Sequence, residues 1–111
     1  SEEIITKNNI IIDNNKNLLF INKGNKLLIC NLDGSTSEIS IESLDTNSYL
    51  GFYNSTNQLL FSSNNELFFL DNNFNRVNSI VFNNEIKSIN NYSDYIIIQT
   101  EKDPCKRYNN T

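Results

Sequence analysis

Two stretches of the chain, NLLFINKGNKLLICNLDGSTSEISI (residues 17–41) and NQLLFSSNNELFFLDNNFNRVNSIVF (residues 57–82), follow one pattern. A third, shorter copy, NYSDYIIIQTEKDPCKRYN, occupies residues 91–109. The step from Leu18 to Leu59 is 41 residues, and the step from Leu59 to Tyr95 is 36. Repetition at this spacing is typical of stacked β units, because one small unit cannot bury its apolar face alone.

Short apolar runs recur along the whole chain, and each is bounded by Asn, Asp, Gly or Ser, which favours strands joined by tight turns. The runs are residues 10–12, 18–21, 27–30, 39–41, 49–53, 59–61, 67–70, 77–82, 86–89 and 95–98. We predict an all-β fold of about ten short antiparallel strands in stacked meander repeats of roughly 40 residues. A propeller-like, a solenoid-like and a sandwich arrangement all satisfy this pattern.

The turn residues divide the chain into repeat units of three strands each. Lys23-Gly24-Asn25-Lys26 and Asn64-Asn65 separate the first two apolar runs of their units, as hairpin turns do. We expect a single domain, residues 1–111, with units at about 17–48, 57–84 and a truncated 91–111, cut from a longer array.

Residues 33–38 and 71–75 offer oxygens at alternating positions, but both lack the Gly and Glu of a calcium-binding EF-hand loop. Ordinary Asx turns are therefore expected there.

The strands themselves do not alternate between apolar and polar residues. LLFI (18–21), LLIC (27–30), LFFL (67–70) and YIII (95–98) are continuous apolar runs. An antiparallel strand with one wet face alternates, so these strands are expected to be covered on both faces.

Composition excludes several classes of function. The net charge is −4 and no basic stripe exists, which argues against nucleic-acid binding. The chain has no His, so a Ser-His or Cys-His nucleophile is impossible and no catalytic residue is assigned. Two cysteines cannot complete a four-ligand metal site, and no cofactor is expected. The longest apolar runs have four residues, so membrane insertion is not expected. Cys30 and Cys105 either form a disulfide or remain thiols.

Aromatic side chains provide the candidate binding residues, because Tyr supplies rigid amphipathic contact area and is favoured in interfaces. They recur where the second and third units begin and near the end of the chain: Tyr49, Phe52, Tyr53, Tyr92, Tyr95 and Tyr108. One alternative is that they cap strand ends and fill the core. The other is a repeating face that docks a protein partner.

Two resemblances follow from these motifs. EIKSINNYSDYIIIQT (85–100) resembles a strand-turn-strand of WD-like propeller blades, and NKLLICNLDGS (25–35) resembles another strand with its turn; the Gly-His and Trp-Asp pairs of that family are missing. LFINKGNKLLICNLDGSTSEI (19–39) is similar to the repeated units of scaffoldins from cellulosomes of anaerobic gut fungi. Its matching motifs are Phe20-Ile21-Asn22, Leu28-Ile29-Cys30 and Gly51-Phe52-Tyr53-Asn54.

The scaffoldin resemblance implies a non-catalytic, extracellular, cohesin-like module that binds dockerin domains of polysaccharide-degrading enzymes. The composition, with 23 Asn and no Ala, suits such a source. The propeller resemblance implies instead a fragment of a scaffold in a cytoplasmic assembly. A carbohydrate-binding module is a third alternative, because stacked Tyr rings suit the faces of sugars.

Overall fold

The structure is a computed structural model, and it describes residues 10–53 and 58–109. Asn54 of the scaffoldin-like motif, Asn57 at the expected start of the second repeat, and residues 110–111 lie outside the described residues. The chain divides into two compact units, Ser1–Leu50 and Gly51–Thr111.

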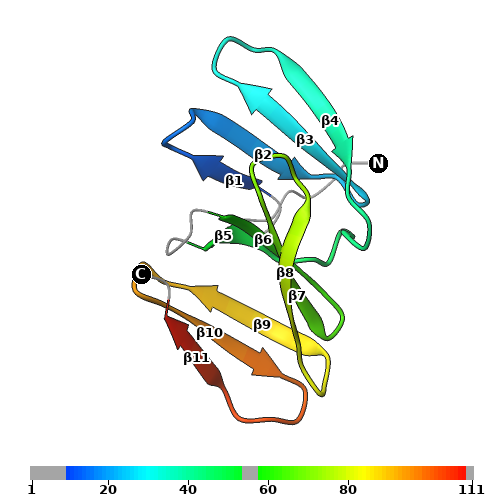
Figure 1. Ribbon diagram of the computed structural model, residues 1–111, viewed down its shortest axis with the longest axis vertical. Coiled ribbons are helices and arrows are strands. Elements are labelled where there is room, and N and C mark those ends of the chain that lie inside the picture. Colours follow the sequence, from blue (N-terminus) through cyan, green and yellow to red (C-terminus); the bar gives the residue numbers. More distant parts are fainter. Residues whose placement is uncertain (1–9, 54–57, 110–111) are drawn as a thin grey trace, which may run out of the picture. The chain divides into compact units, whose positions relative to one another are not determined.

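The fold is all-β, as the sequence predicts, with antiparallel strands arranged in three sheets. Figure 1 shows each sheet as a meander in which strands adjacent in sequence lie side by side. The first sheet contains β1 (Ile10–Asp13), β2 (Leu18–Asn22), β3 (Lys26–Asn31) and β4 (Thr36–Ser40). The second contains β5 (Leu50–Tyr53), β6 (Gln58–Ser63), β7 (Glu66–Leu70) and β8 (Arg76–Val81). The third contains β9 (Ile86–Asn91), β10 (Tyr95–Thr100) and β11 (Lys106–Asn109).

The composition of the sheets differs from the expected three strands per unit. The first two sheets have four strands, because the strand before each repeated pair joins it by antiparallel pairing, as β1 pairs with β2. The third sheet has three strands among the described residues. Its last strand, β11, has the sequence KRYN and contains no apolar run, so the apolar-run pattern does not predict it.

Asparagine and glycine form the turns as expected. Gly24 and Asn64 take positive φ angles of 93° and 53° between the central strands of the first and second sheets. The Asp33 and Asp71 carboxylates each accept a hydrogen bond from the backbone N–H two residues on, so both expected Asx turns are present. Phe74 occupies the turn position that Gly34 fills in the first sheet, and it too has a positive φ, 65°. Residues other than Gly and Asn rarely adopt this backbone conformation, so the backbone of Phe74 is strained.

Four strands were predicted to be buried on both faces, and the structure confirms this prediction for one of them. All four apolar residues of β7, Leu67 to Leu70, are buried. The prediction is wrong for β2, β3 and β10, in which only some of the apolar residues are buried and the others are half-buried. For β10 the reason lies within the second unit: one face packs toward the second sheet, while the other is left half-exposed.

Candidate functional site

The two faces of the third sheet follow from its register. Ile96, Ile98 and Thr100 alternate along β10 with Tyr95, Ile97 and Gln99, and successive residues of a strand point to opposite faces. Ile96 and Ile98 are 2% and 1% exposed, whereas Tyr95, Ile97 and Gln99 are all half-buried. The first set therefore defines a core face and the second an outer face.

The third sheet is fixed to the second sheet by three contacts, two of them made by side chains of the core face. The Phe82 ring, just after β8, meets the Tyr108 ring edge-on at a centroid distance of 6.3 Å. The Asn91 side chain donates a hydrogen bond to the Phe52 carbonyl oxygen at 2.8 Å. The Ile86 N–H donates to the carbonyl oxygen of Asn64, in the β6–β7 turn, at 2.7 Å. The outer face is consequently held in a defined position relative to the second sheet.

The outer face carries an aromatic and a cationic group in contact. The Tyr92 and Tyr95 rings have centroids 5.1 Å apart and are tilted by 42°. The Arg107 guanidinium carbon lies 5.4 Å from the centre of the Tyr95 ring, within the range of a cation–π interaction. Register explains the contact: Ile97 pairs with Arg107, and Tyr95 lies on the same face two residues away. We call Tyr92, Tyr95 and Arg107, together with Ile97, the Tyr–Arg surface.

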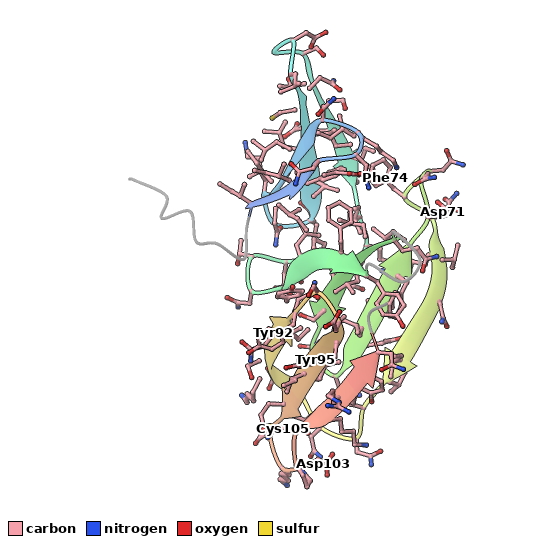
Figure 2. All side chains as sticks on the ribbon, turned by 90° about the vertical axis from the view of Figure 1, so that its left-hand side faces the viewer. Asp71, Phe74, Tyr92, Tyr95, Asp103 and Cys105 are labelled. Atoms are coloured by element: carbon pink, nitrogen blue, oxygen red, sulfur yellow. The ribbon has the colours of Figure 1, made fainter. Side chains whose placement is uncertain are left out.

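Figure 2 shows Tyr92 and Tyr95 beside each other at one end of the third sheet, with Asp103 and Cys105 at its other end. Tyr92 is 48% exposed and lies in the β9–β10 turn, so its ring is accessible from solvent. Arg107 is exposed as well. Tyr and Arg, with Trp, are the residue types enriched among those that contribute most of the binding energy in protein interfaces.

The other predicted aromatic residues are not part of this surface. Tyr53 meets Phe69 edge-on at 5.3 Å, and Tyr108 belongs to the core face. Tyr49 and Phe52 are half-buried at the start of the second sheet and within β5. Sequence reasoning missed Arg107, because it lies in the strand that the apolar runs did not reveal.

The other described residues that could carry a function lie outside the Tyr–Arg surface. The Arg76 guanidinium carbon lies 4.1 Å from the centre of the Phe68 ring and covers the aromatic pair Phe61–Phe68. Cys30 and Cys105 are free thiols, and the Cys105 thiol donates to the Gln99 side-chain oxygen. Within residues 10–53 and 58–109, no group of three or more His, Cys, Asp or Glu residues could hold a metal ion. The same part of the chain contains no helix with the length and hydrophobicity of a membrane-spanning segment.

The carboxyl group of Asp33 has a pKa below its ordinary value. The Ser35 hydroxyl, and next the Ser35 backbone N–H, donate to this carboxylate at 2.7 and 2.9 Å, and these hydrogen bonds lower the pKa of Asp33 from its ordinary value. The group is fully exposed, so the shift reflects turn geometry rather than a reactive carboxylate.

Comparison with known proteins identifies a likeness of fold. No protein-family model matches the chain, and no curated protein sequence does. A crystal structure of selenomethionine-substituted virginiamycin B lyase from Staphylococcus aureus, a propeller, superposes with a TM-score of 0.57. The superposition covers 90% of this chain at 18% identity, and the chain spans 40% of the lyase. At this identity the likeness concerns the fold alone.

Proposed function

We propose that the chain is a non-catalytic protein-binding module built from propeller-type blades, and that the Tyr–Arg surface is its binding site. The observation that carries the proposal is the contact of Tyr92, Tyr95 and Arg107 on the outer face of the third sheet. Rigid aromatic rings beside a guanidinium offer apolar area and directed hydrogen bonds to a protein partner.

The propeller likeness supports the repeated architecture of such a scaffold. A WD-like propeller segment in a larger assembly, which the second resemblance in the sequence implies, is compatible with three consecutive antiparallel meanders. The partner stays a prediction from resemblance. Residues 19–39 resemble fungal scaffoldin repeats, so a dockerin domain is the first partner to test, and the protein would then be extracellular. Subunits of a cytoplasmic assembly are the second class of partner to test.

The Tyr ring geometry favours a protein partner over a polysaccharide. Sugar-binding platforms present aromatic faces side by side in one plane, whereas the Tyr92 and Tyr95 rings are tilted by 42°. A tilted pair presents one face and one edge, an arrangement that suits the side chains of another protein.

The test is affinity capture from lysate of the source organism with the wild-type chain and two variants. We expect Tyr95→Ala to reduce capture of the specific partner by about tenfold or more, the typical cost of truncating an interface aromatic. Tyr53→Phe is the matched control, because it alters a tyrosine outside the surface. Recovery of dockerin-bearing enzymes supports the scaffoldin form, and recovery of assembly subunits supports the propeller form. Equal capture by Tyr95→Ala and wild type contradicts the assigned surface, and binding to cellulose or xylan contradicts the protein-binding function.

A further inference from the structure

Asn78 lies in β8, the outer strand of the second sheet, and its side chain contacts the main chain of the next residue. The Ser79 backbone N–H donates a hydrogen bond to Oδ1 of Asn78 at 2.9 Å, and both residues are exposed. Oδ1 and Cγ belong to one planar carboxamide group, so this contact also brings Cγ beside the Ser79 nitrogen. These two atoms form the new bond when an asparagine side chain cyclises onto the backbone.

The Ser79 N–H is free to make this contact because it points away from β7. Phe82 donates its N–H to the Asn65 carbonyl oxygen at 2.8 Å and accepts from the Asn65 side chain at 2.9 Å, so both of its backbone groups face the β6–β7 turn. Backbone groups of successive strand residues point alternately to the two sides of the strand. Ser79, three residues earlier, therefore directs its N–H outward. In the part of the chain that the structure describes, β8 pairs with β7 alone.

We propose that Asn78 is a site of spontaneous deamidation. The Ser79 nitrogen attacks Cγ of Asn78 and closes a five-membered succinimide ring, and Nδ2 leaves as ammonia with the proton that Ser79 loses. Water then opens the ring. Cleavage of the bond from this nitrogen to Cγ gives aspartate, and cleavage of its bond to the main-chain carbonyl carbon of residue 78 gives isoaspartate. The reacting atoms belong to one chain and already lie side by side, which lowers the entropic cost of reaching the transition state.

The backbone around Asn78 is held less firmly than the middle of the sheet. Asn78 pairs with Phe69, and the register shifts at the next pair. There Leu70 faces Arg76, so Val77 is left out of the ladder as the extra residue of a β-bulge. Because strands of the described chain hold β8 from one side, this segment can open locally without separating a second pair of strands. Local opening supplies the backbone rotation that ring closure needs.

A second Asn-Ser pair provides an internal comparison. Asn47 is exposed like Asn78, but the Ser48 N–H donates to the Asp45 carbonyl oxygen at 3.0 Å. Ser48 is also buried, at 3% exposed. Its nitrogen is therefore engaged by another part of the main chain, whereas the Ser79 nitrogen contacts the side chain that it would attack. The two dipeptides are identical in sequence, so a difference between their rates reports the folded structure.

The two products are expected to affect β8 differently. Isoaspartate adds a carbon atom to the main chain at residue 78 and so displaces the pairing with Phe69. Aspartate leaves the main chain unchanged and adds one negative charge to residues 77–82, which carry no charge. We therefore expect the isoaspartate form to unfold at a lower temperature than the variant Asn78→Asp.

The test is to incubate the full chain at slightly alkaline pH in heavy-oxygen water and to follow each asparagine by peptide mapping with mass spectrometry. The heavy oxygen that enters during ring opening distinguishes new product from product present at the start. In the folded chain we expect Asn78 to react about tenfold faster than Asn47, or more. In denaturant the two sites should react at similar rates, because the contacts that distinguish them are gone.

Asn78→Gln is the matched variant, because glutamine keeps the carboxamide but must close a six-membered ring, which forms much more slowly. Product at residue 78 should then be lost while the rate at Asn47 stays unchanged. Equal rates at Asn78 and Asn47 in the folded chain overturn the proposal, and so does a lack of product at Asn78. A difference that persists in denaturant also overturns it, because the local sequence and not the contact with Ser79 would then be the cause.

Discussion

The strands β7 and β10 have the same kind of sequence and different surroundings. LFFL in β7 and YIII in β10 are both continuous apolar runs, yet every residue of the first is buried while the second alternates. In β7, Phe68 and Phe69 point to opposite faces and are 6% and 5% exposed. In β10, Ile96 is buried and Ile97 is half-buried. An unbroken apolar run is thus compatible with two structures. The strand is either covered on both faces, or it has one buried face and one apolar face that is partly exposed.

The largest expected effect tests the buried strand against the half-exposed one. Phe69→Glu places a carboxylate where the ring meets Tyr53 at 5.3 Å, in a position without access to water. Losing a buried Phe costs about 3–5 kcal/mol, and an unpaired buried charge adds to that. Because small domains are stable by about 5–15 kcal/mol, we expect the cooperative thermal transition of this unit to disappear.

Ile97→Glu is the matched control for that variant, because Ile97 lies in an equally apolar run but on the outer face. We expect it to retain the transition, with a loss of about 1 kcal/mol or less. Circular dichroism melts of both variants decide the matter. A wild-type transition in Phe69→Glu would mean that β7 is not covered on both faces.

The second test compares neighbours within β10. Ile96→Ala removes a side chain that is 2% exposed, and we expect a loss of about 2–4 kcal/mol in the free energy of unfolding. Ile97→Ala removes a half-buried one and is expected to cost about 1 kcal/mol. Urea denaturation of the two variants measures the difference. Equal losses would show that the outer face is as well covered as the core face in solution.

The sequence predicted the sheet class, the turns and most of the strands, because apolar runs and Asn or Gly turns are local signals. It did not predict β11, whose residues KRYN have no apolar run and pair through register with β10. It also did not separate Tyr95 from Tyr108, which lie on opposite faces of one sheet. The face on which a side chain lies depends on the pairing register of its strand and on which sheet packs against that face. Neither can be inferred from the sequence of one strand. The same limit applies to Arg107, whose contact with Tyr95 joins residues on two strands.

A third comparison concerns the turns at Gly34 and Phe74, which share a backbone pattern. Gly34 donates to the Asn31 carbonyl and Phe74 to the Asp71 carbonyl, both at 3.0 Å. Both residues have positive φ. No atom lies near the position that a Cβ of residue 34 would take, so a substitution there introduces backbone strain without a steric clash. We expect Gly34→Ala to lower the free energy of unfolding by about 1 kcal/mol.

The second turn tests the same strain in the opposite direction. Phe74→Gly and Phe74→Ala both remove the ring, so their difference isolates the backbone conformation. We expect the Gly variant to be the more stable by about 1 kcal/mol, whereas Ala is the better residue wherever φ is negative. Chemical denaturation of the pair provides the measurement. An Ala variant as stable as the Gly variant would show that the turn relaxes and that Phe74 is not strained.

The smallest expected effect concerns the pH dependence of the Asp33 turn. Hydrogen bonds from the Ser35 hydroxyl and the Ser35 N–H lower the pKa of Asp33, so the folded-state value lies below the unfolded one. The resulting stabilisation is fully present above about pH 4, near the unfolded pKa, and is lost as the pH falls through the folded pKa. Ser35→Ala removes the larger cause, and we expect the Asp33 carboxyl to titrate closer to its ordinary value in an NMR titration. Thr36→Ala, which removes the hydroxyl of the next residue in the chain, is the control and should leave the titration unchanged. If Asp33 titrates in Ser35→Ala as it does in the wild type, the lowered pKa is caused by the backbone N–H groups of the turn and not by the Ser35 hydroxyl.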